Sequence, residues 1–104
     1  MSNGNIIGNR GGIVYTTATL TTAGSSSANA VYTLPNHTFR FLGPAGLIVV
    51  TIPTASGTVT GVTINVNNQS LTLTDNTGAA ITSLTVGEHL WSFNKTTNTI
   101  KALT

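Results

Sequence analysis

Charged side chains are what this sequence most lacks. Only 6% of its 104 residues are Asp, Glu, Lys or Arg, whereas an ordinary soluble domain has about 25%. Its acidic residues are Asp75 and Glu88, and its cations are scattered along the chain. Glycosidases and aspartic proteases need paired carboxylates, and nucleic-acid binders need many phosphate contacts. The composition therefore argues against these enzymes and against nucleic acid as a partner.

Cysteine and long apolar runs are also absent. Without cysteine, disulfides and thiolate metal sites are excluded. His37 and His89 have no close-spaced ligand beside them, so we expect no metal and no cofactor. The longest apolar run, residues 47–50, is far shorter than the ~18 residues of a membrane span. The first residues lack the basic and apolar regions of a signal peptide, so we expect the protein to stay in a cytoplasm, or to leave it by lysis or as part of a particle.

What the chain does contain is typical of a folded β domain. Thr, Asn, Gly and Ser make up about half of it, and 39% of its residues are hydrophobic. Residues 1–12 alternate Gly with Asn, so we expect a flexible N-terminal arm followed by a single domain at 13–104. Ile6 and Ile7 form an apolar pair that could dock the arm on a partner, and a frayed terminus is the alternative. A domain this small has a thin core, so we expect oligomerisation to supplement its stability.

No segment sustains a helical spacing of apolar residues, while Thr, Val and Ile favour strands. Turn residues separate the apolar runs, among them Asn67-Asn68-Gln69, Asp75-Asn76-Thr77-Gly78 and the loop at 94–98. This spacing indicates a sandwich, a jelly roll or a small barrel, and we predict an antiparallel β-sandwich or jelly-roll-like domain. The predicted strands are 13–20, 30–34, 37–42, 46–52, 58–66, 70–74, 80–85, 88–94 and 98–103.

Two of these strands, 46–52 and 88–94, are apolar on both faces, unlike 62–66 and 70–74, which alternate apolar with polar residues. A small two-layered domain has few places to bury both faces of a strand. We predict that Leu47, Val49, Leu90 and Trp91 lie at an oligomer interface. The alternative is a central strand covered by loops.

Few residues suggest chemistry. No Gly-x-Ser-x-Gly elbow and no phosphate-binding loop occur, so we predict that the protein is not an enzyme. Asp75 opens a turn sequence and is interpreted as a turn former. Trp91, with Tyr15 and Tyr32, could form a platform on which sugars stack, although a lone Trp in a small β domain is more often a core or interface residue.

The segments 48–54, 62–68, 88–94 and 99–103 resemble small β-structured virion proteins of tailed bacteriophages, such as capsid decoration proteins, head fibres and tail-fibre tips. The resemblance lies in composition and strand rhythm. It implies a structural virion protein that acts by assembly and binding, forms a homotrimer or another ring, and attaches to capsid or fibre proteins through its arm. The alternative function is a glycan- or receptor-binding module. Head or tail location and strand order stay open.

Overall fold

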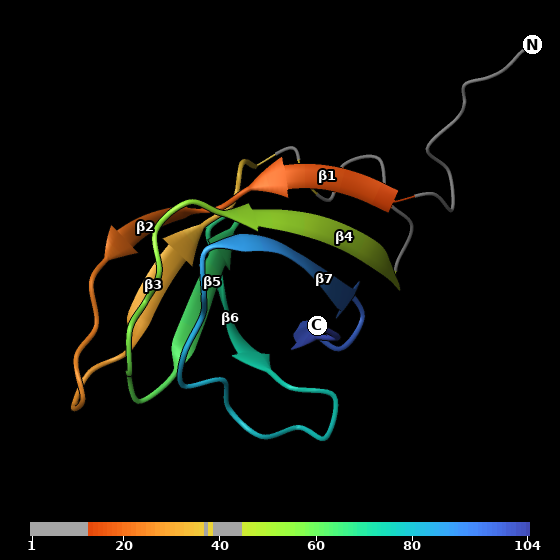
Figure 1. The fold of residues 1–104 in the computed structure, drawn as a ribbon. Helices are drawn as coiled ribbons and strands as arrows, with labels where there is room; N and C mark the ends of the chain where they lie inside the picture. The colour runs from red at the N-terminus through yellow and green to blue at the C-terminus, as the bar shows by residue number, and fades with distance from the viewer. Residues whose placement is uncertain (1–12, 37, 39–44) are drawn as a thin grey trace, which may run out of the picture.

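A computed structural model describes residues 13–36, 38 and 45–104 of the chain. Within this part all regular structure is β, which confirms the predicted all-β class, and no helix there is long and apolar enough to cross a membrane. The described residues form eight strands, which curve around a common interior (Figure 1). The strands are β1 (Ile13–Thr17), β2 (Thr19–Thr22), β3 (Ala30–Thr33), β4 (Ala45–Ile52), β5 (Val62–Val66), β6 (Gln69–Thr74), β7 (Gly87–Asn94) and β8 (Thr99–Ala102).

The strands form one sheet, in the order β1-β4-β7-β8-β6-β5-β3-β2. Its two edge strands, β1 and β2, are consecutive in the chain and are separated only by Ala18. The side chain of Ala18 is fully buried, and its N–H donates a hydrogen bond to the Thr51 carbonyl at 3.0 Å. One stretch of chain therefore joins the two edges, and the sheet comes close to closing as a barrel (Figure 1).

The sheet is mixed, which corrects the prediction of an antiparallel sheet. The pairs β1–β4, β3–β5 and β6–β8 are parallel, and the other neighbours are antiparallel. The parallel pairs arise because the chain alternates between the two halves of the sheet. β4, for example, lies between β3 and β5 in the chain but pairs with β1 and β7. The predicted sandwich or jelly roll is not confirmed by this single continuous sheet.

Three predicted strands differ from those observed. The predicted strand 13–20 is divided at Ala18 into β1 and β2, which lie at opposite edges of the sheet. β5 begins at Val62 rather than at residue 58, and 80–85 is not a strand. In 80–85 the backbone hydrogen bonds go to different neighbours: Ile81 N donates to Leu73 O, and the Thr82 carbonyl accepts from Val59 N. Such isolated bonds do not make a ladder. Most of the predicted strand 37–42 lies outside the described residues.

The turn predictions are confirmed where the structure describes them. Asn67 and Asn68 join β5 to β6 with φ values of 53° and 62°. Two successive positive φ values define a type I′ hairpin turn, whose twist matches that of the strands. Asn98, in the loop between β7 and β8, also has a positive φ of 54°. Asparagine adopts this conformation more readily than most residues because its short side chain hydrogen-bonds locally.

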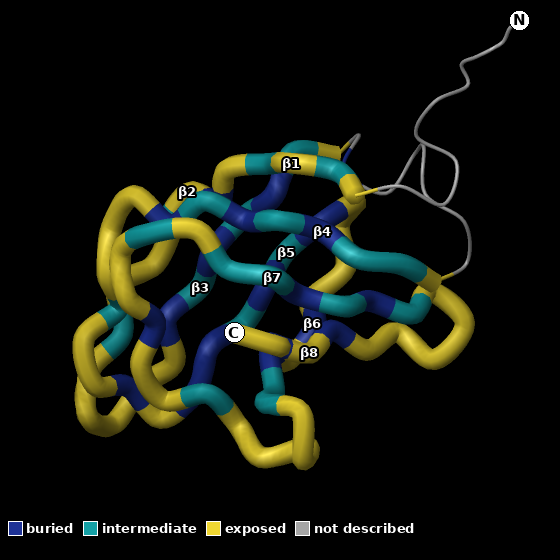
Figure 2. The backbone as a smooth tube through the Cα atoms, turned by 45° about the vertical axis from the view of Figure 1, so that its right-hand side comes forward, coloured by how far each residue is buried: buried dark blue, intermediate teal, exposed yellow. Residues whose placement is uncertain are grey.

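The core lies on the inner face of the curved sheet. In Figure 2, β4, β5 and β7 alternate between buried and partly buried positions, as expected for strands with one face inward. Val14, Leu20 and Ile81 pack against the rim of the core. Its largest fully buried apolar side chains are Trp91, Tyr32, Leu34, Ile48, Ile52, Ile64, Leu73 and Ile100.

Candidate functional site: an outer apolar face and an asparagine end

The outer face of β1, β4, β7 and β8 carries an apolar row that crosses all four strands. Tyr15 is in register with Val49, and Val49 with Leu90. Leu103 continues the row beyond the end of β8, since its N–H donates to the Leu90 carbonyl at 2.8 Å. Tyr15 is 72% exposed and Leu103 is 43% exposed, while Val49 and Leu90 are half-buried.

A second row begins with Ile13, 42% exposed, which is in register with the half-buried Leu47. It then turns polar, because Leu47 is in register with Ser92, and Ser92 with Lys101. We call the apolar part of the two rows the outer apolar face. It consists of Ile13, Tyr15, Leu47, Val49, Leu90 and Leu103.

The structure thus brings together three of the four residues predicted for an interface, and it separates the fourth. Trp91 is 0% exposed and points to the inner face, in register with Ile48 and Ala102. This corrects the prediction that Trp91 lies at an oligomer interface, because its side chain fills the core of its own chain. Its indole Nε1 has no hydrogen-bond partner within the described residues.

Burial also rules out the sugar-stacking platform of aromatic residues. Tyr32 is as buried as Trp91, and its hydroxyl donates to the Thr54 carbonyl at 2.7 Å. Burial raises the pKa of the Tyr32 phenol above its ordinary value. Of the three aromatic residues considered, Tyr15 alone presents its ring to solvent.

Two opposite charges flank the outer apolar face. Glu88 lies two residues before Leu90 on β7, in register with Thr51, and is exposed. Lys101 lies two residues before Leu103 on β8 and is also exposed. Because side chains alternate along a strand, both charges project from the same face as the apolar row. They lie on opposite sides of the row, since Glu88 and Lys101 each precede the row by two residues and β7 and β8 run antiparallel.

The titratable residues have local structural roles. Asp75 Oδ1 accepts hydrogen bonds from Thr77 Oγ1, Thr77 N and Ala79 N at 2.7, 2.8 and 3.0 Å. These bonds, the hydroxyl of Thr77 first, hold the pKa of Asp75 below its ordinary value. The interpretation of Asp75 as a turn former is confirmed.

His89 is half-buried, with Nε2 2.8 Å from the Thr85 carbonyl and Nδ1 3.4 Å from that of Thr104. His37 lies outside the described residues. Within the described part of the chain, no group of three or more His, Asp or Glu residues is placed to hold a metal ion.

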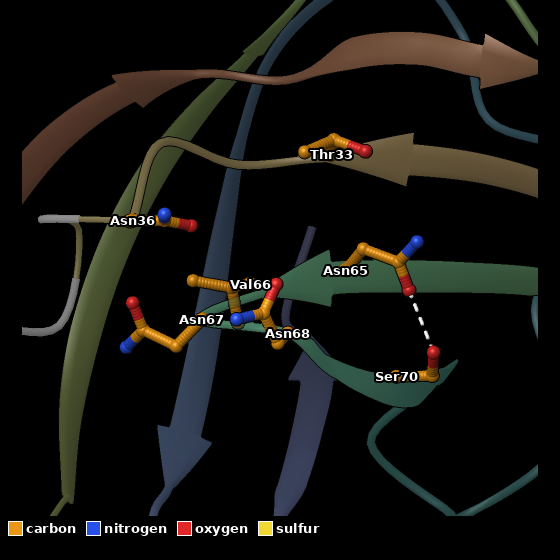
Figure 3. Close-up of a pocket in the computed structure, with 7 residues that line it drawn as sticks. All are labelled: Thr33, Asn36, Asn65, Val66, Asn67, Asn68 and Ser70. Carbon is orange, nitrogen blue, oxygen red and sulfur yellow. Dashed lines mark hydrogen bonds between the residues drawn. The ribbon is translucent and has the colours of Figure 1, made fainter.

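A second feature, at one end of the barrel, was not anticipated as a site. A pocket of about 280 Å³ surrounds the tip of the β5–β6 hairpin, and Figure 3 shows the side chains that line it. A neighbouring pocket of about 240 Å³ shares Asn67 with it and extends to the β7–β8 loop. We call this region the asparagine end, after the asparagines that line one or both pockets: Asn36, Asn65, Asn67, Asn68, Asn94 and Asn98.

Sequence reasoning recognised Asn67 and Asn68 only as turn residues. The parallel pairing of β3 with β5, which sets Thr33 beside Asn65, is what adds the wall formed by Asn36 and Thr33. The signal available in the sequence was the recurrence of asparagine at successive loops, and it does not reveal that these loops meet.

The predicted docking pair, Ile6 and Ile7, lies outside the described residues. The chain matches no protein-family model. No curated protein and no solved structure is significantly similar to it.

Proposed function

We propose that this protein is a structural component that acts by assembly and binding, and that two copies associate through the outer apolar face. The observation that carries the proposal is the row Tyr15–Val49–Leu90–Leu103. Removing apolar surface from water is the main driving force of protein association. Contiguous exposed apolar patches on soluble domains mark interaction sites.

The occupant that best fits this face is a second copy of the same chain. In a two-fold contact, the same patch meets itself. Sheets pack face to face at about 10 Å, so that side chains of facing rows interdigitate. With the two-fold axis along the row, each strand faces its own counterpart running in the opposite direction.

The charges at the rim favour this arrangement. A rotation of 180° about the row keeps each strand opposite its own counterpart and exchanges the two sides of the row. Glu88 therefore faces Ser92 of the second copy, and Lys101 of that copy lies beside Ser92 on the neighbouring strand. The symmetry repeats the pairing, so a dimer contains two such Glu–Lys contacts. Complementary rim charges fix the register of an interface and suppress wrong partners. A two-fold contact also replaces the ring or trimer expected from the resemblance.

The wider setting rests on the resemblance to phage virion proteins. We propose that the dimer is a decoration or fibre component of a particle, with residues 1–12 attaching it to another virion protein. For the fold, we propose a sandwich or jelly-roll-like description, in which β1-β4-β7-β8 faces β6-β5-β3-β2. The buried side chains that both halves direct inward support it.

Adding charge to the two exposed ends of the row tests the assembly. In the double variant Tyr15→Asp/Leu103→Asp, carboxylates replace apolar groups in the contact, while the inner face is left unchanged. Each buried apolar side chain contributes about 1.5–3 kcal/mol, so we expect association at least ~100-fold weaker. Light scattering coupled to size-exclusion chromatography should give a dimer mass for the natural chain and a monomer mass for the variant.

The matched control adds the same charge elsewhere on the sheet. Thr19 on β2 and Thr72 on β6 are exposed and lie in the other half of the sheet. Thr19→Asp/Thr72→Asp should therefore remain dimeric. Circular dichroism would show that both variants keep the β fold. A natural chain that is monomeric at high micromolar concentration, or a control as monomeric as the test variant, would refute the proposal.

A further inference from the structure

The asparagine end is built from three separate parts of the chain. The first part is the end of β3, with Thr33 as its last residue and Asn36 beyond it. The second is the β5–β6 turn of Asn67 and Asn68, and the third runs from Asn94, the last residue of β7, to Asn98 in the β7–β8 loop. Because these parts are distant in sequence, the concentration of amides is a product of the fold. It does not arise from any one turn.

Half of the polar side chains that line the first pocket make no hydrogen bond to the described residues. Asn65 Oδ1 accepts a hydrogen bond from Ser70 Oγ at 2.7 Å (Figure 3), which fixes the amide and leaves its Nδ2 as a donor. The side chains of Asn36, Asn67 and Asn68 make no hydrogen bond to the described part of the chain. Each of these three amides offers both a donor and an acceptor to a ligand.

The chemistry of the first pocket favours a neutral ligand. Among the residues that the structure describes, none that lines this pocket is charged. An amide resembles a hydroxyl group in both donating and accepting hydrogen bonds, so a cluster of amides is suited to a ligand that carries many hydroxyls. The second pocket is also lined by Leu71 and Phe93, which are only 6% and 4% exposed and form its floor, and by Lys95. A polar rim of amides over a small apolar floor suits the hydroxyl edges of a sugar ring.

We propose that the asparagine end binds a neutral oligosaccharide, with one sugar ring in each pocket and Asn67 contacting both. This inference is independent of the proposed dimer, because its residues lie outside the outer apolar face. The proposed glycan site does not include Trp91, which the sequence suggested for sugar stacking but which is buried.

The turn and the amides can be tested separately. Asn67 and Asn68 need positive φ for the type I′ turn, and glycine adopts positive φ without strain. Asn67→Gly/Asn68→Gly therefore keeps the hairpin and removes two amides. The matched control is Asn76→Gly, a change at a different turn that lines neither pocket.

The experiment is binding of the full chain to immobilised neutral oligosaccharides ending in glucose, galactose, mannose or N-acetylglucosamine, alongside sialylated and sulfated ones. We expect a neutral oligosaccharide to bind, and binding to weaken about tenfold or more in Asn67→Gly/Asn68→Gly. Asn76→Gly should bind as the natural chain does.

Three outcomes would overturn the inference. They are no binding to any neutral oligosaccharide at millimolar concentration, binding to acidic glycans alone, and binding that the double glycine variant leaves unchanged. The light-scattering mass of each variant shows whether assembly is preserved, so failure here is distinguishable from failure of the dimer.

Discussion

At Gly24 the chain passes so close to its neighbours that no side chain fits. A Cβ built there would lie 2.6 Å from Ala30 N and 2.8 Å from Ala28 O, both backbone atoms that cannot move cheaply. At Gly61 the nearest atom is the movable side-chain oxygen of Asn29, at 3.2 Å. We expect Gly24→Ala to lower the free energy of unfolding by about 1–3 kcal/mol, and Gly61→Ala to lower it less. Urea unfolding followed by circular dichroism measures both, and equal effects would contradict this account.

Asp75 gives the fold a defined response to acid. Its pKa is lowered in the folded state by the Thr77 hydroxyl and by backbone N–H groups. The stabilisation is therefore fully present above the unfolded pKa of about 3.9, and it is lost as the pH falls through the lower folded value. We expect the urea midpoint to fall as the pH drops below about 4, and Asp75→Asn to reduce this fall.

Thr77→Val removes the hydroxyl that donates to Asp75 and should also reduce the fall. The control is Thr72→Val, the same change at an exposed residue of β6, which should keep the acid sensitivity of the natural chain. If Asp75→Asn is as acid-sensitive as the natural chain, the turn at Asp75 is not its source.

At the scale of single elements, the sequence predicts strands well where one face is apolar and the other polar. The alternation in 70–74 locates β6 within one residue, and the alternating part of the predicted strand 58–66, residues 62–66, is the part that forms β5. The same reasoning fails for 80–85, because local composition favours a strand but no neighbouring strand is available along its length. A segment becomes a strand only where a neighbouring strand can pair with it, and the sequence of the segment alone does not specify that neighbour.

β4 and β7 show how far the outer apolar face could be predicted from the sequence. Both carry apolar residues on both faces, so the pattern predicts an unusual environment without telling which face is inward. Leu47, Val49 and Leu90 prove to be outward and Trp91 inward. Large aromatic residues gain most from burial, and this preference explains why Trp91 rather than Leu90 faces the core.

At the scale of the whole molecule, strand order decides where the sites are. The outer apolar face exists because β1 pairs with β4 and β8 with β7, which aligns residues from both ends of the sequence. The asparagine end exists because β3 pairs with β5. The β1–β4 and β3–β5 pairings are parallel and long-range, and the local periodicity that predicts strands contains no information on them. Hence the all-β class could be predicted from the sequence, whereas the outer apolar face and the asparagine end could be located only from the three-dimensional structure.

The central claim is that the outer apolar face forms a two-fold contact with Glu88 beside Lys101 of the second copy. Glu88→Lys alone and Lys101→Glu alone each place two pairs of like charges at the contact. Exposed ion pairs contribute about 0.2–1 kcal/mol, and reversal turns attraction into repulsion, so we expect each variant to dimerise roughly tenfold more weakly.

Mixing the two variants restores both opposite-charge contacts in a heterodimer. The most direct measurement is therefore sedimentation velocity of each variant alone and of their equimolar mixture, at a concentration where the natural chain is dimeric. We expect mostly monomer for each variant alone and dimer for the mixture, with the difference between them reduced at high salt because salt screens both the attraction and the repulsion. A mixture that sediments as the average of the two separate variants would contradict it.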